Sequence, residues 1–258
     1  MPLITTGQPT GTPTWIDLNV PDVERAMEFY GAVFGWEFTP AGPGGYVQAL
    51  VRGCRVAGLR PLQGQATGTP RWHVYFATDD CDATLRTATD AGATVLAPAA
   101  DKGDQGRAAV LADPGGAPFG LWQARTLPGC ERVNEPDTLV RNDLTTPDPA
   151  SAREFYAKVF GFTLDTNPDL PGSEDFTFLR RPDGHEIGGI QGDPEAAEAA
   201  WGTLFEVADA DRTAERAVAA GGRATTPEDT RYVRLAELTD PFGTVFHIGA
   251  RPSAAPTS

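Results

Sequence analysis

The sequence predicts an α+β protein made of four βαβββ modules in two similar halves. The prediction rests on motifs that recur at a nearly constant spacing. The segment FYGAVFG at 29–35 returns as FYAKVFG at 155–161, an offset of 126 residues. The turn DPGG at 113–116 returns as DPFG at 240–243, an offset of 127. Trp72 ahead of a strand returns as Trp201, an offset of 129. Landmarks in one order at nearly one offset indicate a duplicated domain.

The first module shows the period of each of its elements. Residues 15–20 alternate between apolar and other side chains, which is the pattern of a strand with one core face. Pro21 and Asp22 then begin a helix whose apolar residues recur at spacings of three and four up to Phe34, and Gly35 ends it. Strands at 45–51 and 55–61 follow, with Gly53 as the turn residue.

The other three modules repeat this order of strand, helix and further strands. The predicted elements are strand 72–78, helix 82–91 and strands 108–111 and 119–124; strand 139–145, helix 151–160 and strands 177–180 and 186–190; and strand 203–207, helix 211–220 and strands 232–238 and 245–248. The polar, proline-bracketed segment 127–137 is typical of a linker. We therefore expect one domain at 13–126 and a second at 138–250.

Composition excludes several classes of function. The 258 residues carry a formal net charge of −14, which repels nucleic acid and anionic membranes. The sequence has no apolar run near the roughly 18 residues of a membrane span, and its N-terminal segment lacks the features of a signal peptide. The three cysteines are scattered without a CxxC pair, as in reduced proteins. We expect a cytoplasmic protein that binds neither nucleic acid nor membrane.

Two segments and the two turns carry a family resemblance. The segments are VPDVERAMEFYGAVFGW at 20–36 and TPDPASAREFYAKVFGF at 146–162, each paired with its DPxG turn. Together they resemble the vicinal oxygen chelate superfamily of glyoxalases, bleomycin-resistance-type binding proteins and extradiol dioxygenases. The resemblance covers about residues 13–126 and 137–250. It implies that two modules close a cup-shaped mixed sheet around a cleft, where the first and last strands of the modules hold a divalent metal.

The resemblance also implies where the metal ligands would lie. On the first strands these positions are Trp15, His73, Arg141 and Gly202, and on the last strands they are Gly58, Gly120, Gly189 and His247. Only the two histidines are competent ligands, whereas such a centre needs about three. Either pairing of the modules gives one histidine per cleft. We therefore expect no metal-binding residues and no bound cofactor, with a divalent metal as the alternative, and we expect the glycines to enlarge the clefts.

The strand faces that carry these positions also supply the candidate site residues. The predicted substrate-binding residues are Trp15, Asp17, Asn19, Tyr75 and Trp122 in the first half, and Arg141 and Asp143 in the second. Aromatic walls with a few polar groups are typical of small-molecule pockets. The candidate catalytic residues are His73, and His247 with Glu206 as an acid/base pair if their side chains converge. Asp17 and Asp143 recur at an offset of 126, which suits a structural role as well as a functional one.

Three functions fit these observations. The first is a binding protein that sequesters a small aromatic or carbonyl-containing molecule for resistance, and the second is a metal-independent enzyme. The third is a metal-dependent glyoxalase-like lyase acting on 2-oxoaldehydes, or a dioxygenase or hydroxylase. In each case the partner is a small-molecule ligand or substrate, and the protein is a monomer or a homodimer. The sequence leaves the pairing of the modules open.

Overall fold

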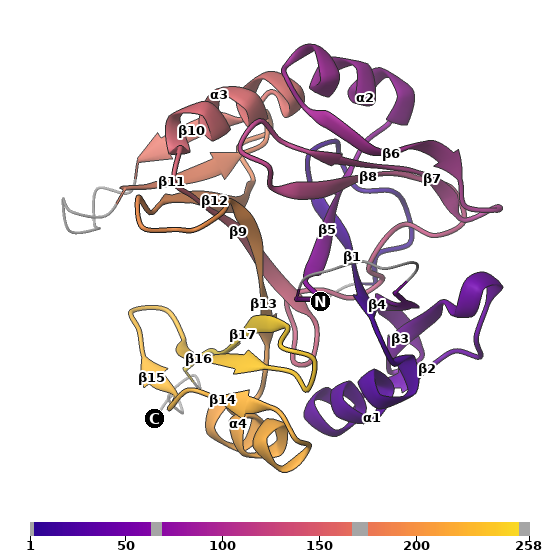
Figure 1. Cartoon of the computed structure of the whole chain (residues 1–258), viewed down its shortest axis with the longest axis vertical. Coiled ribbons are helices and arrows are strands. Elements are labelled where there is room, and N and C mark those ends of the chain that lie inside the picture. Colours follow the sequence, from indigo (N-terminus) through magenta and orange to yellow (C-terminus); the bar gives the residue numbers. More distant parts are fainter. Residues whose placement is uncertain (1–2, 63–68, 167–174, 253–258) are drawn as a thin grey trace, which may run out of the picture.

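The computed structural model describes residues 3–62, 69–166 and 175–252, and each half of the chain forms one mixed sheet with two helices (Figure 1). The elements of the first half are β1 (Pro13–Val20), α1 (Val23–Phe34), β2 (Glu37–Phe38), a 3₁₀ turn (Pro43–Gly45), β3 (Val47–Val51), β4 (Cys54–Pro61), β5 (Trp72–Ala77), α2 (Cys81–Asp90), β6 (Thr94–Asp101), β7 (Gly106–Ala112) and β8 (Pro118–Ala124).

The second half repeats this arrangement with small differences. Its elements are β9 (Leu139–Thr146), α3 (Pro149–Phe160), β10 (Thr163–Thr166), β11 (Asp175–Arg180), β12 (Glu186–Gly192), β13 (Ala200–Glu206), α4 (Ala210–Ala219), β14 (Arg223–Ala224), β15 (Glu228–Asp229), β16 (Arg234–Thr239) and β17 (Val245–Ala250). The predicted α+β class is therefore confirmed.

Strand order settles which modules share a sheet. The first sheet runs β2-β3-β4-β1-β5-β8-β7-β6 and the second β10-β11-β12-β9-β13-β17-β16-β14, with β15 paired to β16. Modules one and two thus form one sheet, and modules three and four form the other. In both sheets the first strand of the half runs parallel to one neighbour and antiparallel to the other. Neither sheet closes into a barrel.

Each sheet curves away from the other, and its convex side faces the shared core (Figure 1). We call the inner face of the first sheet, which carries Trp15, Asp17, His73 and Tyr75, the first cup. We call the inner face of the second sheet, which carries Arg141, Asp143 and His247, the second cup. The alternate residues of the same strands, such as Ile16 and Phe205, are fully buried in the core.

An aspartate side chain begins every helix, as the sequence predicts for the first. Asp22, Asp80, Asp148 and Asp209 each accept a hydrogen bond from the backbone N–H three residues later, which satisfies one free donor of the first turn. Helices α1 and α3 end at glycines in the left-handed conformation, at positions 35 and 161. These signals fix helix bounds close to the predicted ones.

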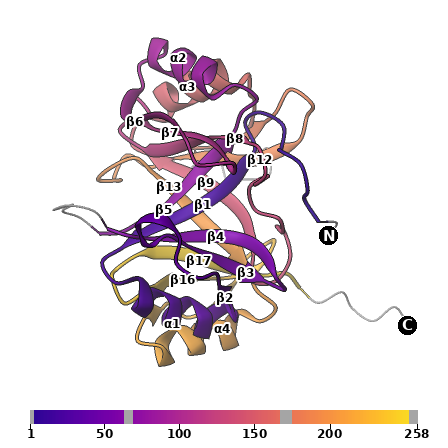
Figure 2. The same cartoon turned by 90° about the vertical axis from the view of Figure 1, so that its right-hand side faces the viewer.

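The helices pair across the two halves. Helix α1 lies beside α4, and α2 lies beside α3 (Figures 1 and 2). Aromatic side chains fill the space behind them. Tyr30 of α1 contacts Phe246 of β17 with ring centroids 5.7 Å apart, and Tyr156 of α3 contacts Phe119 of β8 at the same centroid distance. The two halves therefore share one hydrophobic core.

The recurring motifs of the sequence meet each other across this core. The hydroxyl of Tyr30 donates to Asp240 Oδ2 at 3.0 Å, and the hydroxyl of Tyr156 donates to Asp113 Oδ2 at 3.1 Å. The other oxygen of each aspartate accepts backbone N–H groups of its own DPxG turn. Each half thus supplies the tyrosine for the other half's turn, and this exchange explains why both motifs are duplicated.

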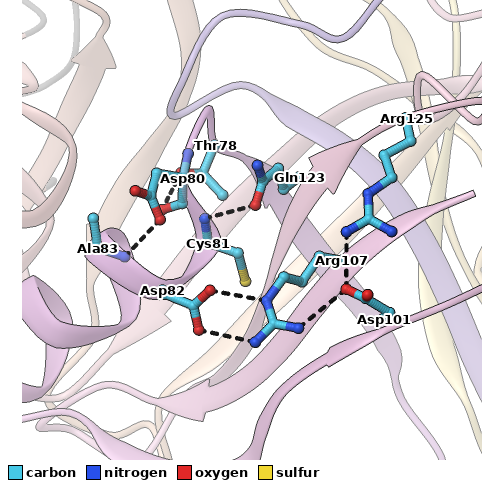
Figure 3. A network of polar contacts seen from close by, with 9 residues as sticks. All are labelled: Thr78, Asp80, Cys81, Asp82, Ala83, Asp101, Arg107, Gln123 and Arg125. Carbon is cyan, nitrogen blue, oxygen red and sulfur yellow. Dashed lines mark hydrogen bonds and ion pairs between the residues drawn. The ribbon is translucent and has the colours of Figure 1, made fainter.

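A second duplicated network fastens the start of α2 to β7 (Figure 3). Arg107 donates two hydrogen bonds to Asp82 and one to Asp101, and Arg125 also donates to Asp101. Arg234 makes the same bonds to Asp211 and Asp229 at the start of α4. Because both halves contain this network, its residues belong to the structural frame.

The sequence analysis did not predict five of the strands that the structure describes, namely β2, β6, β10, β14 and β15. Four of them have two to four residues, too few to show a period. Strand β6 has eight residues, but it lies at the edge of its sheet, contains Pro98 and leaves Val95 and Leu96 exposed. An edge strand buries little apolar surface and therefore leaves little pattern in the sequence. Among the described residues, none of the helices is long and apolar enough to span a membrane.

Candidate functional site

Asp17 occupies the centre of the first cup. In the sheet register it lies opposite Gly58 of β4 on one side and opposite His73 of β5 on the other. The residue is 3% exposed. Asp17 Oδ2 accepts a hydrogen bond from the Tyr75 hydroxyl at 3.2 Å and one from Arg60 Nη2 at 3.3 Å. A single carboxyl oxygen thus holds two donors from neighbouring strands.

Burial dominates the titration of Asp17. It raises the pKa of the carboxyl from 3.8 to about 6, while the charge of Arg60, the hydrogen bond of Tyr75 and the charge of Lys102 act in the opposite direction. A carboxyl with a pKa near the ambient pH can both accept and return a proton. Buried carboxyls of this kind are concentrated at functional sites.

His73 lies beside Asp17 and packs edge-on against Tyr75, with ring centroids 5.0 Å apart. Burial and the nearby charge of Arg60 lower the pKa of His73 to about 4, although a hydrogen bond with the Phe119 backbone acts against this. The imidazole is therefore neutral at physiological pH. A neutral imidazole keeps one nitrogen as a hydrogen-bond acceptor.

Two residues that the sequence analysis did not single out complete the first cup. Tyr46 accepts a hydrogen bond at its hydroxyl from Trp15 Nε1 at 3.1 Å, and the Arg60 guanidinium lies 5.2 Å from the centre of the Tyr46 ring. Tyr46 directly precedes β3 and lies inside the segment 45–51 that the sequence predicts as a strand. The one sequence signal for it is the strand glycine Gly58, beside which an aromatic ring often packs.

The expectation that the strand glycines enlarge the clefts is wrong at three of four positions. A Cβ atom at Gly58 would lie 1.9 Å from the Tyr46 hydroxyl, and one at Gly120 would lie 2.0 Å from the Tyr75 ring. At Gly189 it would lie 2.2 Å from the Phe176 ring. Aromatic rings therefore cover these glycines. Only Gly202 is exposed, and a Cβ atom there would have no neighbour closer than 3.5 Å.

We expect Gly120→Ala to lower the free energy of unfolding by about 1–2 kcal/mol, because the buried Tyr75 ring must shift to admit a methyl group. Gly202→Ala in the second cup is the matched control, and it should change stability by less than about 0.5 kcal/mol. Urea unfolding followed by circular dichroism measures both. Equal effects of the two substitutions would contradict the close packing of Tyr75 on Gly120.

Arg141 fills the corresponding part of the second cup. Its Nε lies 2.8 Å and 2.7 Å from the two oxygens of Asp143, and its Nη1 lies 2.6 Å from Glu186 Oε1. The guanidinium also lies 5.7 Å from the ring centre of Phe176 and 5.5 Å from that of Phe178. Burial raises the pKa of Asp143, and Arg141 lowers it. The carboxylate that corresponds to Asp17 is thus occupied by an internal cation.

The structure gives His247 and Glu206 different partners. His247 Nε2 lies 3.9 Å from Glu237 Oε2, and burial lowers the pKa of His247 while Glu237 and Asp143 raise it. Glu206 Oε2 lies 2.9 Å from Arg251 Nη2. In the register His247 faces Leu204, two residues before Glu206. The acid/base pair expected from these two residues is not formed here.

The remaining predicted residues of the first half lie at its margins. Asn19 is half-buried opposite Arg60. Trp122 is buried and donates from Nε1 to the backbone oxygen of Leu127 in the linker, at 3.0 Å. It also lines a cavity of about 290 Å³ beneath the N-terminal segment. The other lining residues are Gly7, Gln8, Ala77, Thr78, Asp79, Gln123, Ala124 and Pro128.

Comparison of the two halves distinguishes residues that hold the fold together, which we call the frame, from residues that line the two cups. The frame residues recur, including the helix caps, the tyrosine–aspartate pairs and the arginine networks. Several lining residues differ at equivalent register positions. The central aspartate faces His73 in the first cup and Gly202 in the second. On the neighbouring strand pair, Tyr75 faces Gly120 in the first cup, whereas Leu204 faces His247 in the second. The central aspartate and the ring-covered glycine opposite it, Gly58 or Gly189, are common to both cups. The frame therefore carries two different sites.

The residues of neither cup fit a three-ligand metal centre. Within residues 3–62, 69–166 and 175–252, no three His, Cys, Asp or Glu side chains form a group that could hold a metal ion. Rings cover the glycines at three of the implied ligand positions. The two central aspartates are engaged by Arg60 and Arg141. We therefore derive no chemistry through a metal.

Comparisons with known proteins agree with this architecture. The curated relatives include "Putative glyoxylase CFP32" of Mycobacterium tuberculosis, 38% identical over 247 residues that cover 92% of this chain and 94% of that protein. They also include "Anthracycline biosynthesis protein DnrV" of Streptomyces peucetius, 34% identical over 261 residues, 92% of each protein. The crystal structure of the Mn(II)-bound glyoxalase from Novosphingobium aromaticivorans superimposes with a TM-score of 0.68 at 19% identity, over 93% of this chain and 83% of that one.

Family models match both halves of the chain. Residues 15–122 match the glyoxalase-like domain, and residues 138–248 match the glyoxalase/bleomycin resistance protein/dioxygenase superfamily. The two matches in tandem agree with the two sheets and confirm the resemblance seen in the repeated motifs. The chain therefore belongs to the glyoxalase/bleomycin resistance protein/dioxygenase superfamily, also called the vicinal oxygen chelate superfamily, and carries two of its domains in tandem.

Proposed function

We propose that the first cup binds a small aromatic molecule that carries a hydroxyl or carbonyl group, and that it does so without a metal. The observation that carries this proposal is the buried carboxyl of Asp17, placed among Trp15, Tyr46 and Tyr75. Burying an ionisable group is costly, and Asp17 recurs as Asp143 beside a different cross-strand neighbour, His73 instead of Gly202. Such a group in an aromatic surrounding supports a ligand site.

The exposure of the surrounding residues supports an entry path. Trp15 and Asp17 are buried at the floor, whereas His73 and Tyr46 are partly exposed. The side chain of Arg60, which reaches Asp17, is 36% exposed. A ligand that enters beside Arg60 reaches the carboxyl directly and can stack on the aromatic rings.

The name of one relative supports the aromatic class, and that of another does not. DnrV is described as an anthracycline biosynthesis protein, and anthracyclines contain fused aromatic rings. CFP32 is described as a glyoxylase, which would favour a 2-oxoaldehyde instead. The first cup favours the aromatic ligand, because the aromatic residues Trp15, Tyr46 and Tyr75 surround Asp17.

Binding and catalysis are both compatible with this site. Sequestration needs the aromatic wall and the carboxyl alone. A metal-independent enzyme would add proton transfer by Asp17, whose pKa of about 6 suits an acid/base role near neutral pH. We propose sequestration or such metal-independent chemistry, performed in the cytoplasm by a monomer or a homodimer. The alternative is a metal-dependent lyase or dioxygenase.

Elemental analysis and calorimetry before and after EDTA treatment test this proposal. We expect substoichiometric Zn, Ni, Fe and Mn in the untagged protein, and we expect EDTA to leave the affinity for 2-naphthol, a simple aromatic probe, unchanged. About one metal per chain, with binding or methylglyoxal turnover lost on chelation, would favour the metal-dependent alternative. Both the untreated and the EDTA-treated protein are measured with and without added Mn(II), which gives four samples and completes the test.

A further inference from the structure

We infer that the first cup selects ligands through an aryl hydroxyl group, which donates a hydrogen bond to Asp17 and accepts one from Tyr46. This inference rests on the proposed function and narrows it from aromatic hydroxyl or carbonyl compounds to hydroxylated arenes. It follows from which polar atoms of the first cup already have partners and which do not.

Asp17 has one engaged oxygen and one free oxygen. Oδ2 accepts both the Tyr75 hydroxyl and Arg60 Nη2, and Oδ1 accepts no hydrogen bond from any residue that the structure describes. Burial raises the pKa of Asp17 to about 6 against the opposing charge of Arg60, so the ionised carboxylate predominates at neutral pH. An ionised carboxylate only accepts hydrogen bonds. A ligand beside Oδ1 therefore needs a donor.

His73, the cross-strand neighbour of Asp17, adds acceptor character to this part of the cup. Its ring is neutral at physiological pH, because burial lowers its pKa to about 4. Its Nε2 atom is buried and has no hydrogen-bond partner within the described part of the chain. A ligand that places a carbonyl oxygen here would therefore bring one hydrogen-bond acceptor against others, which disfavours its binding.

The donors of the first cup are nearly all engaged. Tyr75 and Arg60 donate to Asp17, and Trp15 Nε1 donates to the Tyr46 hydroxyl. Tyr46 itself donates to no atom of the described residues, so its hydroxyl hydrogen is available. This hydroxyl lies over Gly58, directly across the register from Asp17.

A free acceptor on Asp17 and a free donor on Tyr46 match a group that both donates and accepts. An aryl hydroxyl does so with one oxygen. An ether or a ketone can accept from Tyr46 but leaves Asp17 Oδ1 buried against the ligand without a donor, which is unfavourable. Sites built to bind a hydroxyl discriminate strongly against analogues that lack it.

The second cup offers the internal comparison. There both oxygens of Asp143 face Arg141 Nε, at 2.8 Å and 2.7 Å. Neither oxygen is free for a ligand in the way Asp17 Oδ1 is. The preference for a hydroxyl should therefore depend on Asp17 and not on Asp143, which makes Asp143→Asn the matched control.

The test compares 2-naphthol with 2-methoxynaphthalene by calorimetry near neutral pH, in the full-length wild type, Asp17→Asn and Asp143→Asn. We expect the wild type to bind 2-naphthol about tenfold more tightly or better. Asp17→Asn should lose this preference, and a far-UV circular dichroism spectrum that matches the wild type shows that the variant is folded. Asp143→Asn should keep the preference.

Three results would overturn the inference. Equal affinities of the wild type for the two compounds would leave aromatic binding in place but remove the selection of a hydroxyl. A preference that persists in Asp17→Asn would move the recognition to another residue. Binding of neither compound by the wild type would contradict the proposed function itself and the inference with it.

Discussion

Tyr30→Phe and Tyr156→Phe are each expected to lower the free energy of unfolding by about 1.5–3 kcal/mol. Each substitution removes one hydroxyl and keeps the ring in place. The carboxylate oxygen of Asp240 or Asp113 then remains buried in the core without the donor that now lies 3.0 or 3.1 Å away. Truncation of a partner leaves the full desolvation cost of the other group, which is why a single hydroxyl matters here.

Urea unfolding of the two single variants and of the double variant measures these effects. The exposed Tyr232 provides the control, and Tyr232→Phe should change stability by less than about 0.5 kcal/mol. The two pairs share no partner residue, so the losses should add in the double variant. A neutral Tyr30→Phe would mean that the motif contributes through ring packing alone.

The fold was predictable because the sequence motifs that form its frame occur in both halves of the chain. Helix caps, strand alternation and the FY and DPxG motifs each follow from local chemistry, and their recurrence showed the duplication. The exchange between the halves was not predictable. One sequence does not say whether Tyr30 binds the turn of its own half or that of the other, because both turns carry the same Asp-Pro-x-Gly pattern.

The site was predictable to the extent that it follows strand alternation. The period of two places Asp17 and His73 on one face, and the structure brings them side by side. Arg60 escaped because it reaches Asp17 from a neighbouring strand, and Tyr46 escaped because its ring packs on Gly58 of that strand, at positions that only the register defines. The covered glycines escaped for the same reason, since the rings that pack on them come from other positions of the sheet.

Asp17→Asn is expected to stabilise the protein near neutral pH by up to about 3 kcal/mol. Folding raises the pKa of this carboxyl from 3.8 to about 6, so the native state binds the proton more tightly than the unfolded state does. Between about pH 4 and pH 6 the contribution of Asp17 to the stability of the wild type should therefore fall as the pH rises, and this contribution should be lost completely above pH 6. Asparagine resembles the neutral acid and removes this dependence.

Urea unfolding of the wild type and Asp17→Asn across this pH range measures the difference between the two curves. Asp104→Asn, at an exposed position, should change stability by less than about 0.5 kcal/mol. The groups that face Asp17 (Arg60, Tyr75, His73 and Lys102) are the same in both proteins, so they cancel in the comparison. If Asp17→Asn is less stable than the wild type at every pH, the carboxylate is a structural partner of Arg60. If it is more stable and no longer distinguishes 2-naphthol from its methyl ether, then the protein keeps a destabilising charge in its first cup because the ligand requires it.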